Sequence, residues 1–394
     1  MALNLIRNSR VFFTTNVDAA GSVLATGFTA LNTVELQVQD GFSFSQNTTT
    51  ETVTLSEAGS APIRGQRSFN TALEPVDWSI STYIRPKLAE GATITAGPDA
   101  DDFVDCEESV LWNALTSAIA IGTAGAGWVR TVGVSPVSTV NFTNSNKHQL
   151  QTFGLVVVFE AVAYVIDNCA LESATIDFGL DAIASVAWAG KGTTMRQLAS
   201  TTLVNNVVAG TVTLTGGLGG TAKLKDTSAK YIANKLSTMT LSRTTFGGQG
   251  NKTYTLALTG GSLTIANNLT YLTPANLGAV NVPVTYFTGT RAITASVTAY
   301  LKTGVNETST LLNDLLASSA IASENQFAAT VELGGSTNAT RVVFDMPFTV
   351  LSIPTISSEQ VISTTINLMP QAGSNIAYDI EGTNELTVKY YSAA

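Results

Sequence analysis

Six acidic residues that lie close together are the first candidates for chemistry in this sequence, because clustered carboxylates can hold a calcium ion. They are Asp99, Asp101, Asp102, Asp105, Glu107 and Glu108. A calcium loop of the EF-hand type needs glycine at its sixth position and a bidentate glutamate at its twelfth. Counted from Asp99, these positions hold Val104 and Val110. We therefore expect the acidic residues to favour the start of a helix instead, with calcium at a subunit contact as the alternative.

Other reactive side chains are too few to build a catalytic or metal site. His148 is the one histidine of the sequence, so a histidine-based triad or a zinc site lacks partners. Cys106 and Cys169 are the two cysteines, and we expect both to be free thiols in the core. The sequence therefore predicts a protein that is not an enzyme and that uses no metal or cofactor.

Polar side chains that alternate with apolar ones are better candidates for function. In segment 77–84, Trp78, Ile80 and Ile84 alternate with polar residues, and this period of two gives a strand one buried and one outward face. Comparable outward positions occur in three further segments, and none of them is basic. The full set is Glu35, Gln37, Gln39, Asp77, Ser79, Ser81, Thr255, Thr259, Thr294, Ser296 and Thr298.

The elements that carry these positions occur twice. Residues 294–301 repeat 77–84 at a shift of 217, and Tyr254 matches Val34 at a shift of 220. Further matches are Phe44 with Ile265 and Asn47 with Asn268, both at a shift of 221, and Val110 with Leu311 at a shift of 201. Chance matches would scatter, whereas these keep their order along the chain. We infer a tandem duplication of one module.

Each module is predicted to be mainly β, a β-sandwich or barrel with one helix on its flank. The helices are expected at about 106–121 and 307–321, where apolar residues recur with helical spacing. Long strands are expected at about 151–168 and 171–190.

A Gly-, Val- and Thr-rich stretch at 201–228 is the predicted joint between the modules. It gives a first module at 1–200 and a second at 229–394.

Each module also carries a long polar excursion with β-propensity, near 47–70 in the first copy and 266–288 in the second. An extended hairpin of this kind cannot bury both faces on its own module, so we expect an arm that contacts another subunit. The candidate contact residues are Gln46, Asn47, Glu57, Arg64, Asn267, Asn268 and Tyr271.

The composition favours a chain that is covered by copies of itself. Charged residues make up 12% of the 394 residues, about half of the roughly 25% that is usual for a soluble domain. The 29 acidic and 20 basic residues give a net charge of −9, opposite to the basic surface of a nucleic-acid-binding protein. The longest apolar run, 155–166, contains Glu160 and is too short to span a bilayer, so no membrane partner is expected.

Several segments resemble one protein family, in order and over about residues 1–380. The resemblance is carried by Gln46-Asn47, Glu57-Ala58-Gly59, Arg64-Gly65, Phe69-Asn70, the strand from Trp78 to Tyr83, and the segment from Gly260 to Pro274. The chain resembles the major tail tube proteins of long-tailed, non-contractile siphophages of the T-five-like type. Some members add an immunoglobulin-like domain after the second module, and this chain is expected to have none.

The resemblance implies two fused tube modules, of which three chains form a pseudo-hexameric ring. Rings would stack into the tail tube of the virion after assembly in the host cytoplasm, and double-stranded DNA would pass through the bore without specific binding. The implied partners are further copies of the chain, the tape-measure protein, and the tail terminator and distal tail proteins.

Under this resemblance the outward strand positions become candidates for the lumen, although a sandwich could simply expose them to solvent. The alternative function is a β-sandwich tail protein that binds a receptor or carbohydrate. That function needs exposed aromatic residues, whereas Trp78, Trp112 and Trp188 fall on predicted inward faces. A hydrolase is the third reading, and it would need a pair of carboxylates that the repeat does not conserve, since Asp77 matches Thr294.

Overall fold

The structure is a computed structural model that describes most of the chain. The described residues are 9–25, 27–29, 31–53, 67–88, 104–116, 128–131, 137–141, 150–159, 162–198, 230–243, 251–318, 326–335, 340–357, 361–373 and 385–391. Several sequence predictions lie outside these ranges. They concern Glu57, Arg64, His148, Asp99, Asp101, Asp102 and the joint 201–228.

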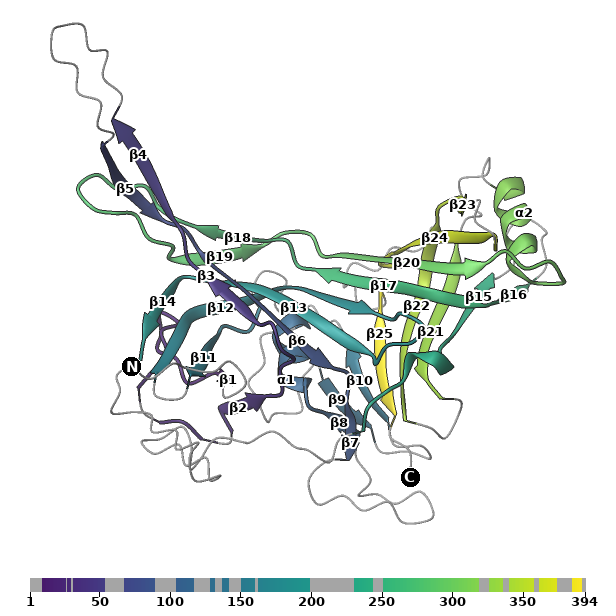
Figure 1. Cartoon of the computed structure of the whole chain (residues 1–394), viewed down its shortest axis with the longest axis horizontal. Helices are drawn as coiled ribbons and strands as arrows, with labels where there is room; N and C mark the ends of the chain where they lie inside the picture. Colours follow the sequence, from purple (N-terminus) through teal and green to yellow (C-terminus); the bar gives the residue numbers. More distant parts are fainter. Residues whose placement is uncertain are drawn as a thin grey trace, which may run out of the picture.

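The described residues are mainly β with one α-helix in each half, which confirms the predicted mainly β fold class (Figure 1). The first half contains β1 (Ser9–Thr14), β2 (Thr33–Leu36), β3 (Ser43–Ser45), β4 (Thr48–Val53), β5 (Arg67–Leu73), β6 (Val76–Tyr83), β7 (Pro86–Leu88), β8 (Val104–Cys106), α1 (Ser109–Thr116), β9 (Trp128–Thr131), β10 (Val137–Asn141), β11 (Phe153–Phe159), β12 (Val162–Asp177), β13 (Ser185–Gly192) and β14 (Thr194–Gln197).

The second half follows a short 3-10 helix at Asn234–Leu236. It contains β15 (Thr238–Arg243), β16 (Lys252–Leu256), β17 (Leu258–Ala266), β18 (Leu269–Leu272), β19 (Thr285–Thr288), β20 (Ala292–Tyr300), α2 (Thr308–Ser318), β21 (Phe327–Gly334), β22 (Arg341–Leu351), β23 (Thr355–Ser357), β24 (Ser363–Pro370) and β25 (Thr387–Tyr391).

The two halves have the same strand order. In the first half, antiparallel neighbours follow as β2-β1-β11-β12-β13-β6-β3. In the second half they follow as β16-β15-β21-β22-β24-β20-β17. The residue matches agree with this order, since Val38 is opposite Thr82 and Leu258 is opposite Ala299, at the shifts of 220 and 217.

One sequence match is wrong by two residues. Phe44 is opposite Trp78 in the first half, and Leu263 is opposite Ala295 in the second. Phe44 therefore corresponds to Leu263 and not to Ile265. A slip of two residues leaves every side chain on its own face of the sheet, so the alternating pattern could not reveal it.

Three predicted element boundaries are also wrong. The strand expected at 151–168 is divided between β11 and β12, and the strand expected at 171–190 is divided between β12 and β13. A mostly apolar run gives no local signal of where one strand ends and the next begins. The first helix begins at Ser109, since Cys106 belongs to β8, which pairs with β7.

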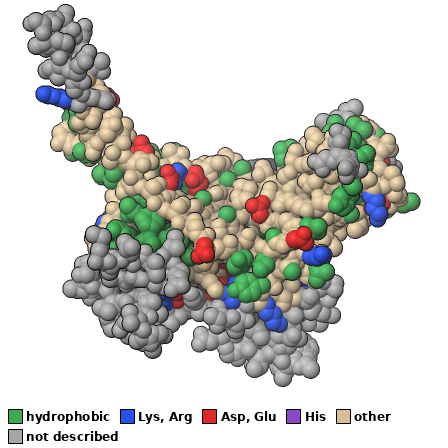
Figure 2. Space-filling view, in the orientation of Figure 1, with side chains coloured by type: hydrophobic (Ala, Val, Ile, Leu, Met, Phe, Trp, Pro, Cys, Tyr) green, Lys and Arg blue, Asp and Glu red, His purple; other side chains and the backbone are tan. Residues whose placement is uncertain are grey.

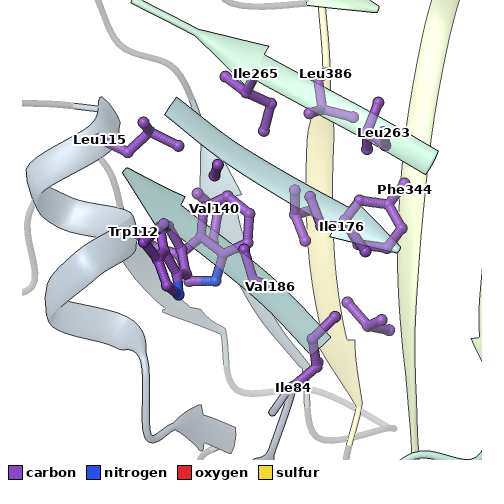
Figure 3. Packing of buried hydrophobic residues seen from close by; sticks show 14 of the residues in the cluster. Ile84, Trp112, Leu115, Val140, Ile176, Val186, Leu263, Ile265, Phe344 and Leu386 are labelled. Atoms are coloured by element: carbon purple, nitrogen blue, oxygen red, sulfur yellow. The ribbon is translucent and has the colours of Figure 1, made fainter. Parts of the chain in front are cut away.

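The halves share one continuous hydrophobic core. β12 of the first half pairs with β17 of the second, and β25 pairs with both β10 and β22. Figure 3 shows Trp112 and Leu115 of α1 in the same core as Leu263, Ile265 and Phe344 from the second half. Trp112 and Trp188 pack edge to face, with ring centroids 5.0 Å apart. The buried Cys106 and Cys169 are free thiols, as predicted.

Candidate functional site

Eight strands form one continuous antiparallel sheet that runs through both halves. Their order is β3-β6-β13-β12-β17-β20-β24-β23, and each half supplies four of them. One row of residues can be followed across this sheet, from Ser81 to Ala187, Thr175, Thr264 and Thr294. Side chains from the two halves therefore stand next to one another on the same face.

Two further rows on this face also consist mostly of small or polar residues. One row contains Ser43, Ser79, Ala189, Ser173, Ala266 and Ala292, and the other contains Tyr83, Ser185, Asp177, Ser262, Ser296 and Asn367. Successive residues of a strand point to opposite faces. The residues in between are accordingly buried in the core, among them Ile80, Trp188, Ile176, Leu263 and Val297. We call the whole face of the eight-strand sheet on which the three rows lie the polar sheet face.

Charge on the polar sheet face is sparse, with Asp177 as an exposed carboxylate and Lys191 as a cation that is paired with carboxylates. Among its described residues the cation is Lys191, whose Nζ lies 2.7 Å from Asp77 and 3.8 Å from Glu172. Partial burial lowers the pKa of Lys191, but the hydrogen bond to Asp77 and the charge of Glu172 outweigh this effect and raise it. In Figure 2 acidic and basic side chains are scattered singly or in small groups over the described part of the viewed surface.

Six of the predicted lumen positions lie on the polar sheet face. They are Asp77, Ser79, Ser81, Thr294, Ser296 and Thr298, and each is exposed or half-buried. The structure thus brings the predicted positions of the two halves onto one surface. Thr259 lies in the irregular stretch between Leu258 and Gly260 at the end of β17, where its hydroxyl donates to the carbonyl of Thr298 at 3.2 Å.

Glu35 does not face solvent, and its predicted outward position is wrong. Its side chain is 3% exposed, and its two oxygens accept hydrogen bonds from Arg10, both at 2.7 Å. Glu35 is opposite Phe12, and that face of β1 is covered by a second small core that includes Phe12 and Phe28. The alternating pattern of β2 could not show that both of its faces are covered.

Gln37 and Gln39, two other predicted lumen positions, are half-buried beside β6. Val38 between them is opposite Thr82, and the backbone N–H of Gln39 donates to the carbonyl of Ser81 at 2.7 Å. Gln39 therefore lies next to Ser81, at the edge of the polar sheet face. Thr255 is exposed but belongs to β16, which pairs with β15, outside the eight-strand sheet. The alternating pattern shows which residues of a strand share a face but not where the strand lies in the sheet, so Thr255 was grouped with the other lumen positions.

The predicted arms are two hairpins, β4–β5 and β18–β19, which extend toward the same end of the molecule (Figure 1). They touch at Asn281, which bonds to Thr71 and Leu73 through backbone groups at 3.1 and 2.8 Å. The strands β4 and β5 are largely exposed. Asn47 and Asn268 stand at the bases of the two hairpins, where each carbonyl accepts a backbone bond at 2.9 Å from Glu74 and Gly289 respectively.

Three predicted arm residues form contacts within the chain. Gln46 bonds through its side chain to the carbonyls of Glu74 and Thr193, at 2.9 and 3.0 Å. Asn267 is buried and donates to carbonyls of the first half. The hydroxyl of Tyr271 lies 2.8 Å and 2.9 Å from carbonyls of Asn168 and Lys191. The second hairpin is therefore anchored on the first half of its own chain through Asn267 and Tyr271. The contact of these three residues with another subunit stays a prediction.

Sequence reasoning missed the central strands of the polar sheet face. Ser173, Thr175 and Asp177 of β12 and Ala187 of β13 belong to it. They alternate with Ala174, Ile176 and Val186, which is the same signal that identified β6. The predicted strand at 171–190 merged the end of β12 with β13, and its outward residues were not among the predicted lumen positions.

In the part of the chain that the structure describes, no cluster of three or more acidic, cysteine or histidine residues could hold a metal ion. No described helix is long and apolar enough to cross a membrane. Glu108 directly precedes α1, and its backbone carbonyl accepts from Leu111 and Trp112 at 2.9 and 3.2 Å. Its side chain accepts a hydrogen bond from Tyr390, and the first turn of α1 contains no acidic residue. Trp78, Trp112 and Trp188 are at most 3% exposed and so offer no platform for a sugar.

Comparison with known proteins gives one clear relative. No protein-family model matches the chain. The chain is 30% identical over 371 residues to the tail tube protein pb6 of Escherichia phage T5, across 93% of this chain and 72% of that protein. At this coverage the match includes residues of both halves. This chain belongs to the T5-like family of phage tail tube proteins, which are components of the virion tail.

Proposed function

We propose that three copies of the chain close a ring in which the polar sheet face lines the bore, and that such rings stack into a tail tube. The observation that carries this proposal is the eight-strand sheet, to which each half contributes four strands. Three copies would supply about 24 strands, and at a spacing of about 4.8 Å and a tilt of about 45° these close at a backbone radius of roughly 26 Å. Side chains would leave a bore of roughly 40 Å, wide enough for duplex DNA.

The chemistry of the polar sheet face suits a channel that lets DNA pass without holding it. Each phosphate that a lysine or arginine neutralises adds salt-dependent adhesion. The described residues of this face are mostly Ser, Thr and Ala, and Lys191 is already engaged by Asp77 and Glu172. The net charge of −9 adds no attraction for DNA. The protein would act as a structural component, and chemical turnover would play no part in its role.

The same proposal gives the partners. Further copies contact the ring edges and the two faces of each ring, the tape-measure protein occupies the bore during assembly, and the terminator and distal tail proteins meet the two ends of the tube. The repeated strand order of the two halves supports a gene duplication that turned a sixfold ring into one of three chains.

Electron microscopy of the purified, concentrated protein tests the proposal. We expect hollow rods, or rings with threefold symmetry, in negative stain. A protein that stays monomeric at every concentration, or that forms rods without a central channel, would contradict it. Thermal unfolding with and without sugars examines the receptor-binding alternative, which requires a rise in the unfolding temperature when sugar is added.

A further inference from the structure

Within the eight-strand sheet, β12 of the first half and β17 of the second half pair over a short antiparallel stretch. Residues 173–177 of β12 lie opposite 262–266 of β17. Thr175 is opposite Thr264, and their hydroxyl oxygens are 3.2 Å apart. Ile176 is opposite Leu263, and these side chains are 0% and 2% exposed. We call this pairing the internal joint.

The repeat supplies an equivalent for each side of the internal joint. Ser79 corresponds to Ser296, and their neighbours Ser43 and Ser262 therefore correspond to one another. β3 is thus the first-half equivalent of the segment of β17 that meets β12.

The other strand of the internal joint is β12, and its equivalent in the second half is β23. Phe153 is opposite Cys169, and its equivalent Phe327 is opposite Thr349, which sets a shift of 180 between β12 and the continuous path of β22 and β23. At this shift Thr175 corresponds to Thr355. The neighbouring strands support this match, because Thr175 is opposite Ala187 of β13 and Thr355 is opposite Thr365 of β24, the equivalent strand. β23 is therefore the second-half equivalent of the end of β12 that meets β17.

Within one chain these two equivalents do not meet. Among the described strands, β3 pairs with β6 and β23 pairs with β24, at opposite ends of the eight-strand sheet. Ile356 of β23 is 54% exposed and Phe44 of β3 is half-buried, although their counterparts Ile176 and Leu263 are buried in the internal joint. At each end of the eight-strand sheet, the end strand therefore leaves an apolar side chain less buried than its counterpart in the internal joint.

We propose, resting on the ring described above, that β23 of one copy pairs with β3 of the next copy in the register of the internal joint. Thr355 then lies opposite the neighbour's Ser45, Ile356 opposite its Phe44, and Ser357 opposite its Ser43. The strands of the sheet alternate in direction and are even in number, so its two end strands run antiparallel when copies are joined. Ile356 and Phe44 bury one another on the core side, while the serines and Thr355 continue the polar sheet face across the seam.

The register can be tested with disulfides because the internal joint supplies a matched control. At the two ends of the internal joint, the N–H of Phe178 donates to the carbonyl of Gly261 and the N–H of Asn267 donates to the carbonyl of Glu172. Hydrogen-bonded and non-hydrogen-bonded pairs alternate along an antiparallel ladder. Thr175 and Thr264 are therefore a pair whose backbones do not bond to one another. Such pairs have Cα atoms about 4.5 Å apart, within the range that a disulfide spans. The same holds for Thr355 and the neighbour's Ser45, and the native Cys106 and Cys169 are at most 1% exposed.

The experiment compares three double variants under mild oxidation in concentrated, assembled protein. Ser45→Cys with Thr355→Cys should link chains into dimers and closed trimers that reductant releases. Ser43→Cys with Thr355→Cys shifts the register by two residues, beyond disulfide reach, and should leave most chains unlinked. Thr175→Cys with Thr264→Cys should form its disulfide inside single chains.

The outcomes separate this inference from the proposed function. Wild-type rods together with unlinked Ser45/Thr355 chains and a closed Thr175/Thr264 control would overturn the seam and leave the tube standing. Preferential linking of the Ser43/Thr355 pair would overturn the register. If the Ser45/Thr355 double variant does not assemble, a mixture of the two single-cysteine variants should give linked dimers at most, and their absence in rods would count against the seam. Absence of wild-type rods at any concentration would contradict the tube itself.

Discussion

The indole nitrogen of Trp112 donates a hydrogen bond to the hydroxyl oxygen of Tyr390 at 2.8 Å, and this hydroxyl donates to Oε1 of Glu108 at 2.7 Å. Trp112 and Glu108 lie at the start of α1 in the first half, whereas Tyr390 lies in β25 at the end of the second. All three residues are at most 1% exposed. The chain thus closes with a buried polar contact between its two halves.

The buried carboxyl predicts that the protein loses stability as the pH rises. Burial raises the pKa of Glu108 from 4.5 to about 7, although the hydrogen bond from Tyr390 opposes this shift. The folded state binds the proton of Glu108 more tightly than the unfolded state does. The stability that protonated Glu108 contributes to the folded state is therefore complete below pH 4.5 and is lost as the pH rises through 7. The loss in free energy of unfolding amounts to about 3 kcal/mol. Urea unfolding of the unassembled protein at pH 5 and pH 8 measures it.

Glu108→Gln should remove most of this pH dependence, since the amide oxygen still accepts from Tyr390 and does not titrate. Glu307→Gln is the matched control, because Glu307 occupies the equivalent place before α2 and its carbonyl likewise accepts from the helix. The control should keep the loss seen in the wild type. An equal loss between pH 5 and pH 8 in Glu108→Gln would show that other groups cause it.

The hydroxyl of Tyr271 should stabilise the contact between the second hairpin and the first half. Tyr271→Phe leaves the carbonyls of Asn168 and Lys191 without this donor, and we expect a loss of about 1–2 kcal/mol in the free energy of unfolding. Tyr300→Phe, at a position that is 45% exposed, should change stability little. Equal effects of the two substitutions in thermal unfolding would argue against a specific role for the Tyr271 hydroxyl.

Strand alternation was enough to predict the buried and outward faces of β6 and β20, because a half-buried strand repeats every two residues. The same pattern could not tell where a strand lies within the sheet, so Thr255 was grouped with Ser79 although β16 lies outside the eight-strand run that contains β6. Nor could it detect cover on both faces, as at Glu35. Pairing of β12 with β17 depends on contacts distant in sequence, and no local signal in either strand specifies its partner.

Gly190 should be required for the close approach of β13 to its neighbours. A Cβ atom built there would lie 2.2 Å from the Trp78 ring and 2.5 Å from the backbone oxygen of Ala170. Gly190→Ala therefore forces a shift in the sheet, and we expect a loss of about 1–3 kcal/mol. Gly179→Ala is the matched control, since the nearest atom is 4.0 Å away. Similar unfolding midpoints for both variants would mean that the sheet relaxes without cost.

Added positive charge on the polar sheet face should slow the passage of DNA while leaving the tube intact. Ser79 and Thr294 are exposed and come from different halves, so Ser79→Lys with Thr294→Lys would place two lysines per chain in the bore. Phosphates would then bind transiently at each ring, more strongly at low salt. Phage that carry both substitutions should show normal tails in micrographs and slower DNA ejection, with a delay that shrinks as salt increases. Thr255→Lys, outside the eight-strand sheet, should not slow ejection. A delay with Thr255→Lys alone would move the lumen to the β16 surface.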